Sequence, residues 1–272
     1  MLQIMSIFAF MKRNYNERPA GLYAAEDIES VMIGMEDAAQ REVLCRFFKT
    51  GAGQYGEGDM FLGLKVPRTR EVVSLARLGV PLAEIEKLLY SKWHEVRLCG
   101  FLLLVEEMKA AIPRRKELPA VRAEHRREIA GFYLSHATQA NNWDLVDLSC
   151  PSIVGQWLLY PSEDGHLPST EILDRLAASS NLWEQRISIV STLSLIKAGR
   201  YDETLRISTA LLGHPHDLIH KAVGWMLREL GKKDAELLRE YLSAHCREMP
   251  RTTLRYAIEK FSPEERQYWL NL

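Results

Sequence analysis

The chain has 272 residues, 47% of them hydrophobic, which is enough to bury a full core in one large domain or two small ones. Its 35 Lys and Arg residues are balanced by 36 Asp and Glu residues, which excludes a generally basic, histone-like binder but allows a local basic groove. No stretch approaches the ~20 apolar residues of a membrane span. The four cysteines are widely spaced without a CxxC pair, so we expect buried reduced thiols and no zinc site.

The N-terminal residues 1–20 show no regular pattern, and we predict an irregular arm there, followed by a single helical domain over residues 21–272. The first eleven residues are apolar, but Lys12 and Arg13 follow this run instead of preceding it. A signal peptide has the opposite order, so we expect a cytoplasmic protein.

A glycine-rich segment, Gly51-Ala52-Gly53-Gln54-Tyr55-Gly56, contains the letters of a GxGxxG motif. Apolar residues recur at helical spacing over residues 27–49, so two helices are predicted before it. A dinucleotide-binding fingerprint follows a strand and opens a helix, whereas this segment follows a helix and continues as loop. We interpret it as an interhelical loop and expect no nucleotide cofactor, and indeed no cofactor of any kind.

From Pro67 to the C-terminus the pattern is helical, with short connections that contain Gly, Pro or Ser and no convincing strand pair. The class is therefore all-α. The predicted helices span residues 68–78, 82–90, 92–109, 119–136, 142–159, 169–178, 182–198, 202–212, 216–230, 234–244 and 251–260.

One basic stretch stands out within these helices, with Arg122, Arg126 and Arg127 following a run of three basic residues at 114–116. Glu124 and Glu128 alternate with these arginines, so we predict a solvated helix face and no nucleic-acid contact there.

A loose repeat occurs near the starts of four long helices, at intervals of about 35–50 residues. Its members are Glu95-Val96-Arg97, Asp144-Leu145-Val146, Glu184-Gln185-Arg186 and Ile219-His220-Lys221. The spacing is typical of a two-helix solenoid unit, so we predict an α-α superhelix whose second helices line a concave groove.

The segment around Trp143 places an indole and two carboxylates, Asp144 and Asp147, within five positions. In a helix Trp143 and Asp147 project from one face. An acid beside an aromatic ring suits a cationic substrate, but a core Trp with two solvated acids is an equally simple interpretation.

Cations and a further indole recur later in the chain, where Lys221, Trp225 and Arg228 form one helical stripe and Arg255 follows Thr252. A groove lined by such residues suits a phosphate backbone. Alternatively, Trp225 belongs to the core, Arg255 is a solvated residue, and Arg186 pairs with Glu184 or Asp147 as scaffold.

Four motifs in order resemble the HEAT-like-repeat DNA alkylation repair family, the DNA glycosylases for N3- and N7-alkylpurines. They are Tyr55-Gly56-x-Gly58-Asp59-x-Phe61-Leu62-Gly63-x-x-x-Pro67-x-x-Arg70, Asn142-Trp143-Asp144-x-x-Asp147, Asn181-x-Trp183-x-Gln185-Arg186 and Lys221-Ala222-Val223-Gly224-Trp225-x-Leu227-Arg228-Glu229. The resemblance covers about residues 50–260 and implies a superhelix of HEAT-like repeats. The sequence departs from some relatives at Asn142, where they carry a further aromatic residue.

The resemblance implies Asp147 as the catalytic carboxylate, Trp143 and Trp225 as aromatic walls at the lesion, and Arg186 as a holder of the nearby phosphate. The implied DNA contacts are Tyr55, Trp183, Lys221, Arg228, Thr252 and Arg255. The implied partner is duplex DNA with alkylated purines, and no membrane partner is expected. We expect a monomer that recognises the lesion without a deep base-extrusion pocket.

These side chains suit hydrolysis of a cationic N3- or N7-alkylated purine nucleotide. The base leaves neutral, so no general acid is needed, and a carboxylate stabilises the oxocarbenium-like sugar and orients water. No lysine lies in the motif to form a Schiff base, which predicts a monofunctional enzyme of the DNA-3-methyladenine/7-methylguanine glycosylase type. The alternative is a catalytically silent helical-repeat module that binds DNA structures or serves as a protein scaffold. A metal enzyme is not expected, because the eight histidines form no HExxH motif.

Overall fold

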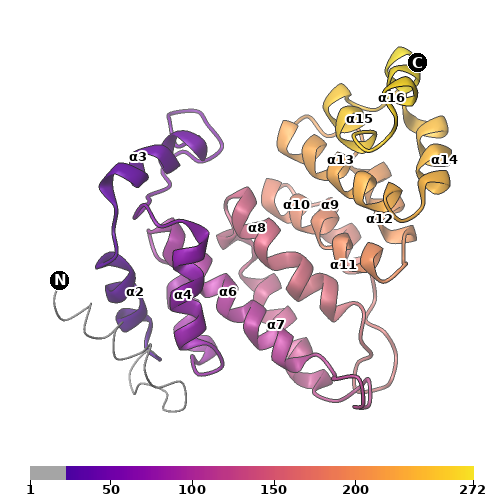
Figure 1. The fold of residues 1–272 in the computed structure, drawn as a ribbon. Helices are drawn as coiled ribbons and strands as arrows, with labels where there is room; N and C mark the ends of the chain where they lie inside the picture. Colours follow the sequence, from indigo (N-terminus) through magenta and orange to yellow (C-terminus); the bar gives the residue numbers. More distant parts are fainter. Residues whose placement is uncertain (1–22) are drawn as a thin grey trace. The chain divides into compact units, whose positions relative to one another are not determined.

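The computed structural model describes residues 23–272, which form helices joined by connections of different lengths, among them the long segment 48–65 between α3 and α4 (Figure 1). No β-strand occurs within this range, where Met60 and Trp93 form an isolated parallel bridge. The predicted all-α class is confirmed. The irregular arm predicted for residues 1–20 lies outside the described residues, and the superhelix and the single domain stay predictions.

The described chain divides into two compact units, each with its own buried residues. The first unit contains the described residues up to Ala110 together with Gln139–Leu145. Its helices are α2 (Ala25–Ile33), α3 (Ala38–Phe47), α4 (Val66–Ala76), α5 (Leu82–Leu89), nearly all of α6 (His94–Ala111) and the first residues of α8 (Trp143–Cys150). Helix α2 packs on α4 and α5 through fully buried side chains such as Ile28 and Met32.

The second unit contains residues 111–138 and 146–272. Its helices are α7 (Ala123–Ser135), the rest of α8, the π-helical turn η2 (Pro151–Gly155), α9 (Glu171–Ala177), α10 (Leu182–Val190), α11 (Thr192–Lys197), α12 (Asp202–Ala210), α13 (Asp217–Gly231), α14 (Ala235–His245), α15 (Arg251–Ala257) and α16 (Pro263–Asn271). A short 3-10 turn, η1 (Ala137–Gln139), follows α7. Helix α13 is central to this unit, since it packs on α10, α12, α14 and α15.

The four repeat segments each lie in the N-terminal part of a helix, namely α6, α8, α10 and α13, as the sequence predicts. Two predicted helices are interrupted. The helix predicted over 142–159 changes to the π-helical turn at Pro151, because proline has no N–H to continue the α-helical ladder. The helix predicted over 182–198 is divided at Ser191 into α10 and α11.

Helix α16 was not predicted, because its sequence is strongly charged and buries Trp269 alone. Its start nevertheless carries local helix signals. Pro263 occupies the first turn, and the Ser262 side chain accepts a hydrogen bond from Glu265 N. Capping residues therefore indicate this helix where hydrophobic periodicity does not.

The prediction of a solvated face at Arg126 is wrong, because its side chain is buried. Its guanidinium donates to the carbonyl oxygens of Ala111 at 3.0 Å, Pro119 at 3.0 Å and Pro161 at 2.9 Å, and also to that of Val121. Five N–H donors in a planar fork allow one arginine to satisfy several loop carbonyls. The neighbouring Arg127 is exposed, as predicted.

The four cysteines are free thiols, and three of them, Cys99, Cys150 and Cys246, are buried. This agrees with the expectation of reduced thiols in the core. Across residues 23–272, each helix is too short or too polar to cross a lipid bilayer.

Candidate functional site

Asp147 and Arg186 form a bidentate ion pair between α8 and α10. Arg186 Nε donates to Asp147 Oδ1 at 2.9 Å, and Nη2 donates to Oδ2 at 2.8 Å. Arg186 is 5% exposed, and the Asp147 side chain keeps 14% of its surface accessible. A bidentate guanidinium–carboxylate pair fixes the plane of the carboxylate as well as its position. The sequence left this pairing as one of two options for Arg186, and the structure forms it.

The third arm of Arg186 reaches the start of α13, where Nη1 donates to the carbonyl oxygen of Leu218 at 2.6 Å. One guanidinium therefore joins α8, α10 and α13 within the second unit. Removing it would take the two N–H donors of Arg186 from a half-buried carboxylate and a third from a backbone carbonyl, which is costly where water has little access.

Local sequence explains why Arg186 is placed so firmly. Asn181 caps α10, and its side-chain oxygen accepts from Trp183 N at 2.9 Å and Glu184 N at 3.2 Å. Gln185 then donates from Nε2 to Ser179 O at 2.7 Å, which ties the first turn of α10 to the preceding loop. Trp183 is 8% exposed, so the free protein offers DNA little of this ring.

A turn that contains His214 and His216 precedes α13 and contacts the first turn of α10. His214 Nδ1 accepts from His216 N at 3.0 Å, and His216 Nδ1 accepts from Leu218 N at 3.1 Å. Both rings therefore carry their proton on Nε2, and His214 Nε2 donates to Gln185 Oε1 at 2.8 Å. Burial lowers the pKa of both imidazoles, which keeps further positive charge away from Arg186 near neutral pH.

The predicted stripe on α13 consists of Lys221, Trp225 and Arg228, all half-buried. Lys221 Nζ pairs with Asp217 at 2.7 Å, and Arg228 pairs with Glu259 and with Glu229. These cations are thus balanced by carboxylates in the free protein. The Lys221–Asp217 pair is largely open to solvent and contributes little stability, so a phosphate can compete for Lys221 at small cost.

Gly224, one residue before Trp225, lets α15 cross α13 closely. A Cβ at this position would lie 2.5 Å from Tyr256 Cβ and 2.6 Å from Thr253 O. The close crossing positions α15, on which Thr252 is half-buried and Arg255 is exposed. The resemblance implied Thr252 and Arg255 as DNA contacts, whereas the crossing of the two helices was not predicted.

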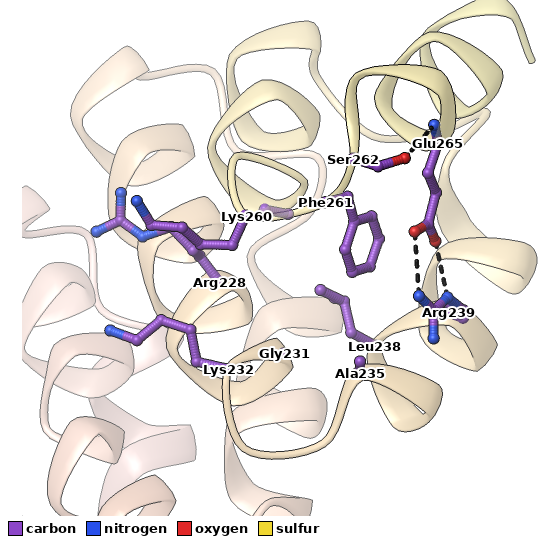
Figure 2. A pocket seen from close by; sticks show the side chains of 11 residues that line it. Arg228, Gly231, Lys232, Ala235, Leu238, Arg239, Lys260, Phe261, Ser262 and Glu265 are labelled. Atoms are coloured by element: carbon purple, nitrogen blue, oxygen red, sulfur yellow. Dashed lines mark hydrogen bonds and ion pairs between the residues drawn. The ribbon is translucent and has the colours of Figure 1, made fainter.

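Beyond Arg228 lies a cavity of about 280 Å³ (Figure 2). Its large apolar side chains are those of Leu238 and Phe261, and Arg239 and Glu265 form an ion pair at one edge. The other lining residues are Arg228, Gly231, Lys232, Ala235, Ala257, Lys260 and Ser262. The cavity could not be predicted from the sequence, because its lining comes from three helices, α13, α14 and α15, from the connections that follow α13 and α15, and from α16.

In the first unit, Trp143 is half-buried and packs within an aromatic cluster. Its ring stacks on Phe48 with centroids 5.3 Å apart and meets Phe47 edge-on at 5.8 Å. Asn142 is buried before it, and its side-chain oxygen accepts from Trp143 N at 2.9 Å. Trp143 is therefore held firmly but is not fully enclosed.

A buried charge network lies behind Trp143, and sequence analysis missed it. His94 donates from Nδ1 to Asp59 Oδ2 at 2.8 Å and from Nε2 to Asp144 Oδ2 at 2.9 Å, while Arg97 pairs with the other oxygen of Asp59. Two carboxylate acceptors require both ring nitrogens to be protonated, so His94 is an imidazolium. Burial lowers its pKa, but the charges and hydrogen bonds of Asp144 and Asp59 outweigh this and raise the pKa to about 9.

Asp144 is thus a buried member of this network, which corrects its interpretation as a solvated acid. Two features of the sequence could have indicated the network: Asp59 ends the loop that begins at Tyr55, and His94 begins a helix. Next in α6, Glu95 accepts from the backbone N–H groups of Leu62, Gly63 and Leu64 at 2.8–2.9 Å. Tyr55 is half-buried in the same loop, with Gly53 and Gly58 in left-handed conformations around it.

The predicted site residues therefore fall in both units. Trp143 and Tyr55 belong to the first, whereas Asp147, Trp183, Arg186, Lys221, Trp225, Arg228, Thr252 and Arg255 belong to the second. Direct contacts join Asp147 to Arg186 in the second unit, and Asp217 bonds both Lys221 and Thr252 there. Within the described range, no group of three or more His, Cys, Asp or Glu side chains is arranged to hold a metal ion.

Comparison with known families decides the classification. The family model described as DNA alkylation repair enzyme matches residues 28–261. The chain belongs to this family. Among solved structures, a predicted DNA alkylation repair enzyme from Enterococcus faecalis has a similar fold, with a TM-score of 0.60 at 17% identity over 84% of this chain and 97% of that one. No match was found among curated proteins. The matched range of this DNA alkylation repair family member includes every residue of the candidate site.

Proposed function

We propose that this member of the DNA alkylation repair family is a monofunctional DNA glycosylase that removes cationic N3- or N7-alkylated purines from duplex DNA. The observation that carries the proposal is the Asp147 carboxylate, which Arg186 holds in a fixed plane while part of its surface stays accessible. Membership of the family supports a role in the repair of alkylated DNA.

The reaction breaks the bond between C1′ of the deoxyribose and the alkylated purine. The bonding electron pair leaves with the base, which becomes neutral, and the sugar becomes oxocarbenium-like. The Asp147 carboxylate stabilises this positive charge and accepts the proton of the water that attacks C1′. The products are an abasic site and the free alkylpurine. No side chain has to protonate the leaving base, so one carboxylate suffices.

The roles of the other residues follow from their chemistry. Arg186 orients Asp147 and, with the charge it carries, attracts the phosphate beside the lesion. The indoles of Trp143 and Trp225 attract the alkylpurine cation at about 0.5–2 kcal/mol each. Lys221, Arg228 and Arg255 contact the phosphate backbone, Thr252 donates a hydrogen bond to it, and Tyr55 adds an aromatic contact. The Trp183 ring is 8% exposed, so we assign it no DNA contact.

Replacing Asp147 by Asn tests the mechanism. The amide has nearly the shape of the carboxylate but no charge, so single-turnover release of 7-methylguanine should fall about 10²–10³-fold. Affinity for the same duplex should change only a few-fold. Released bases are separated by chromatography, and affinity is measured by fluorescence anisotropy.

Asp174→Asn is the matched control, because Asp174 also pairs with an arginine, Arg206, but on the surface of the same unit. This variant should behave like the wild type. An unchanged release rate in Asp147→Asn would remove Asp147 from the mechanism.

A second candidate is a catalytically silent module that binds damaged DNA. The observation favouring it is the same ion pair, since a buried Asp–Arg pair can serve the fold alone. Wild-type protein that binds methylated duplex DNA but releases no base would establish this second function.

A further inference from the structure

The cavity beyond Arg228 has no part in the proposed bond cleavage. Its volume is about 280 Å³, and all of its lining residues belong to the second unit. Pockets for drug-sized ligands measure about 300–1,000 Å³, so this cavity is suited to one small ligand. Four of its lining residues, Gly231, Ala235, Ala257 and Ser262, have small side chains, which leaves the space open.

A chain of alternating charges forms one side of the cavity. Lys232 pairs with Glu229, which also pairs with Arg228. Glu259 pairs with Arg228 as well, and with Lys260 at 2.8 Å. Of these five residues the three cations line the cavity, and Figure 2 shows their charged ends on the same side of it. Two carboxylates balance three cations here, which leaves one positive charge over within the group.

The cations in this chain can exchange their partners for a phosphate. The side chains of Lys232 and Lys260 are 46% and 59% exposed, and ion pairs so open to water contribute little stability. Arg228 Nε has no hydrogen-bond acceptor in the described part of the chain, so this guanidinium has an unused donor. A phosphate monoester carries nearly two negative charges at neutral pH, more than the single charge of a DNA phosphodiester. Three cations therefore suit a terminal phosphate.

Apolar side chains lie next to this charged side. Figure 2 shows Phe261 and Leu238 between the three cations and the ion pair of Arg239 with Glu265. The Arg239 guanidinium lies 5.1 Å from the centroid of the Phe261 ring and helps to hold the ring in place. Phe261 is half-buried, so part of the ring stays open to a ligand. An aromatic surface of this kind binds the face of a planar ring.

The opposite end of the cavity offers both hydrogen-bond donors and acceptors. Arg239 donates from Nε and Nη2 to Glu265 and from Nη1 to Glu236, which accounts for three of its five N–H groups. The Glu265 carboxylate has about four acceptor sites, of which Arg239 and Trp269 occupy three. A guanidinium beside a carboxylate suits the edge of a nucleobase, which carries donors and acceptors together.

We propose that this cavity binds one nucleotide with a terminal phosphate, that is, a nucleoside 5′-monophosphate. The phosphate contacts Arg228, Lys232 and Lys260, the face of the base contacts Phe261, and the edge of the base reaches the ion pair opposite the cations. An aliphatic carboxylate is less suitable, because it brings one charge to three cations and no donor or acceptor to the far end. The proposal does not depend on the glycosylase activity.

Isothermal titration calorimetry with the full chain compares deoxyadenosine 5′-monophosphate with its two fragments, deoxyadenosine and deoxyribose 5-phosphate. The wild type should bind the nucleotide about tenfold more tightly than either fragment, because each fragment lacks one end of the ligand. The same chemistry occurs in a free nucleotide and at the 5′-phosphorylated end of a DNA strand. A DNA hairpin with a 5′-phosphate is therefore compared with the same hairpin with a 5′-hydroxyl. Tighter binding of the phosphorylated hairpin identifies a strand end as the source, and equal binding identifies the free nucleotide.

Two variants separate the ends of the site. Lys232→Gln combined with Lys260→Gln should bind the nucleotide about tenfold more weakly and lose most of the preference for it over deoxyadenosine. Phe261→Leu should also bind the nucleotide about tenfold more weakly, but should lose the preference over deoxyribose 5-phosphate instead.

The matched controls change the same residue types outside the cavity. Lys233→Gln removes an exposed lysine next to Lys232, and Tyr268→Ala removes a ring that is 57% exposed on α16. Both controls should bind all three probes like the wild type.

A wild type that binds the nucleotide no better than both fragments would overturn the proposal. Unchanged affinity and preference in the double lysine variant would do the same, and this variant changes exposed side chains alone, so its fold is preserved. Release of 7-methylguanine is measured separately. A protein that releases no base but shows these preferences for the nucleotide would lose the proposed glycosylase activity and keep this site.

Discussion

At the scale of single residues, two charge arrangements explain most of the polar burial near the candidate site. Arg186 neutralises Asp147 in the second unit, and in the first unit His94 and Arg97 neutralise Asp59 and Asp144. In each case the positive and negative charges balance within hydrogen-bond distance. This balance is the condition under which charges can be buried without a large net penalty.

The His94 network makes stability depend on pH in a defined direction. The folded protein raises the pKa of His94 from 6.5 to about 9, so it binds this proton more tightly than the unfolded chain does. The resulting stabilisation is complete below about pH 6.5, declines between pH 6.5 and 9, and is absent above. Its full size is roughly 3 kcal/mol.

Urea unfolding of wild type and His94→Gln at pH 6 and pH 9 measures this contribution. The difference in unfolding free energy between the two proteins should shrink by roughly 3 kcal/mol from pH 6 to pH 9. Groups that do not contact His94 cancel in the difference. A difference that stays constant with pH would show that His94 is not charged in the folded state.

At the scale of elements, the crossing of α13 and α15 depends on one missing side chain. Gly224→Ala would put a Cβ within 2.6 Å of Thr253 O, a backbone atom that cannot move without displacing α15. We expect a loss of about 1–3 kcal/mol of stability. Because Trp225 is the next residue, the displacement should also slow excision if the proposed function holds.

Gly131→Ala in α7 is the matched control for this prediction. A Cβ at Gly131 meets no atom within 4 Å, and the residue is exposed in mid-helix. This variant should gain about 0.5–1 kcal/mol, because alanine loses less backbone entropy in a helix. Thermal unfolding compares both variants with the wild type, and equal midpoints for the two would contradict the close crossing.

At the scale of the whole molecule, a net charge of −1 gives DNA no general attraction to this protein. Binding must therefore come from a few cations at defined places. Arg255, exposed on α15, is one such cation. Its removal should affect the salt dependence of binding as well as the affinity.

Arg255→Gln should reduce the slope of log affinity against log salt concentration by about 0.9, the value for one lost phosphate contact. Lys197→Gln, an equal change of charge at an exposed position of α11, should leave the slope unchanged. Anisotropy titrations between 50 and 200 mM salt, about the range in which such slopes are measured, give both values. Identical slopes for the three proteins would exclude Arg255 as a phosphate contact.

The all-α class, the glycine-rich loop and the family could all be predicted from the sequence. Apolar spacing, helix caps and short motifs are local properties, which depend on neighbouring residues and not on the rest of the fold. The same local signals placed Arg186 and Lys221 near helix starts. They missed α16, where charge hides the periodicity, and they did not predict that the chain continues from Pro151 as a π-helical turn.

The burial of individual polar residues and the partners that they meet became visible in the folded protein alone. Asp144 and Arg126 read as solvated because their sequence neighbours are polar, yet both are enclosed by residues distant in the chain. The pairing of Asp147 with Arg186, the ring stack behind Trp143 and the crossing at Gly224 also join distant segments. Burial and pairing depend on long-range packing, and a single sequence records the residues that take part but not the distances between them.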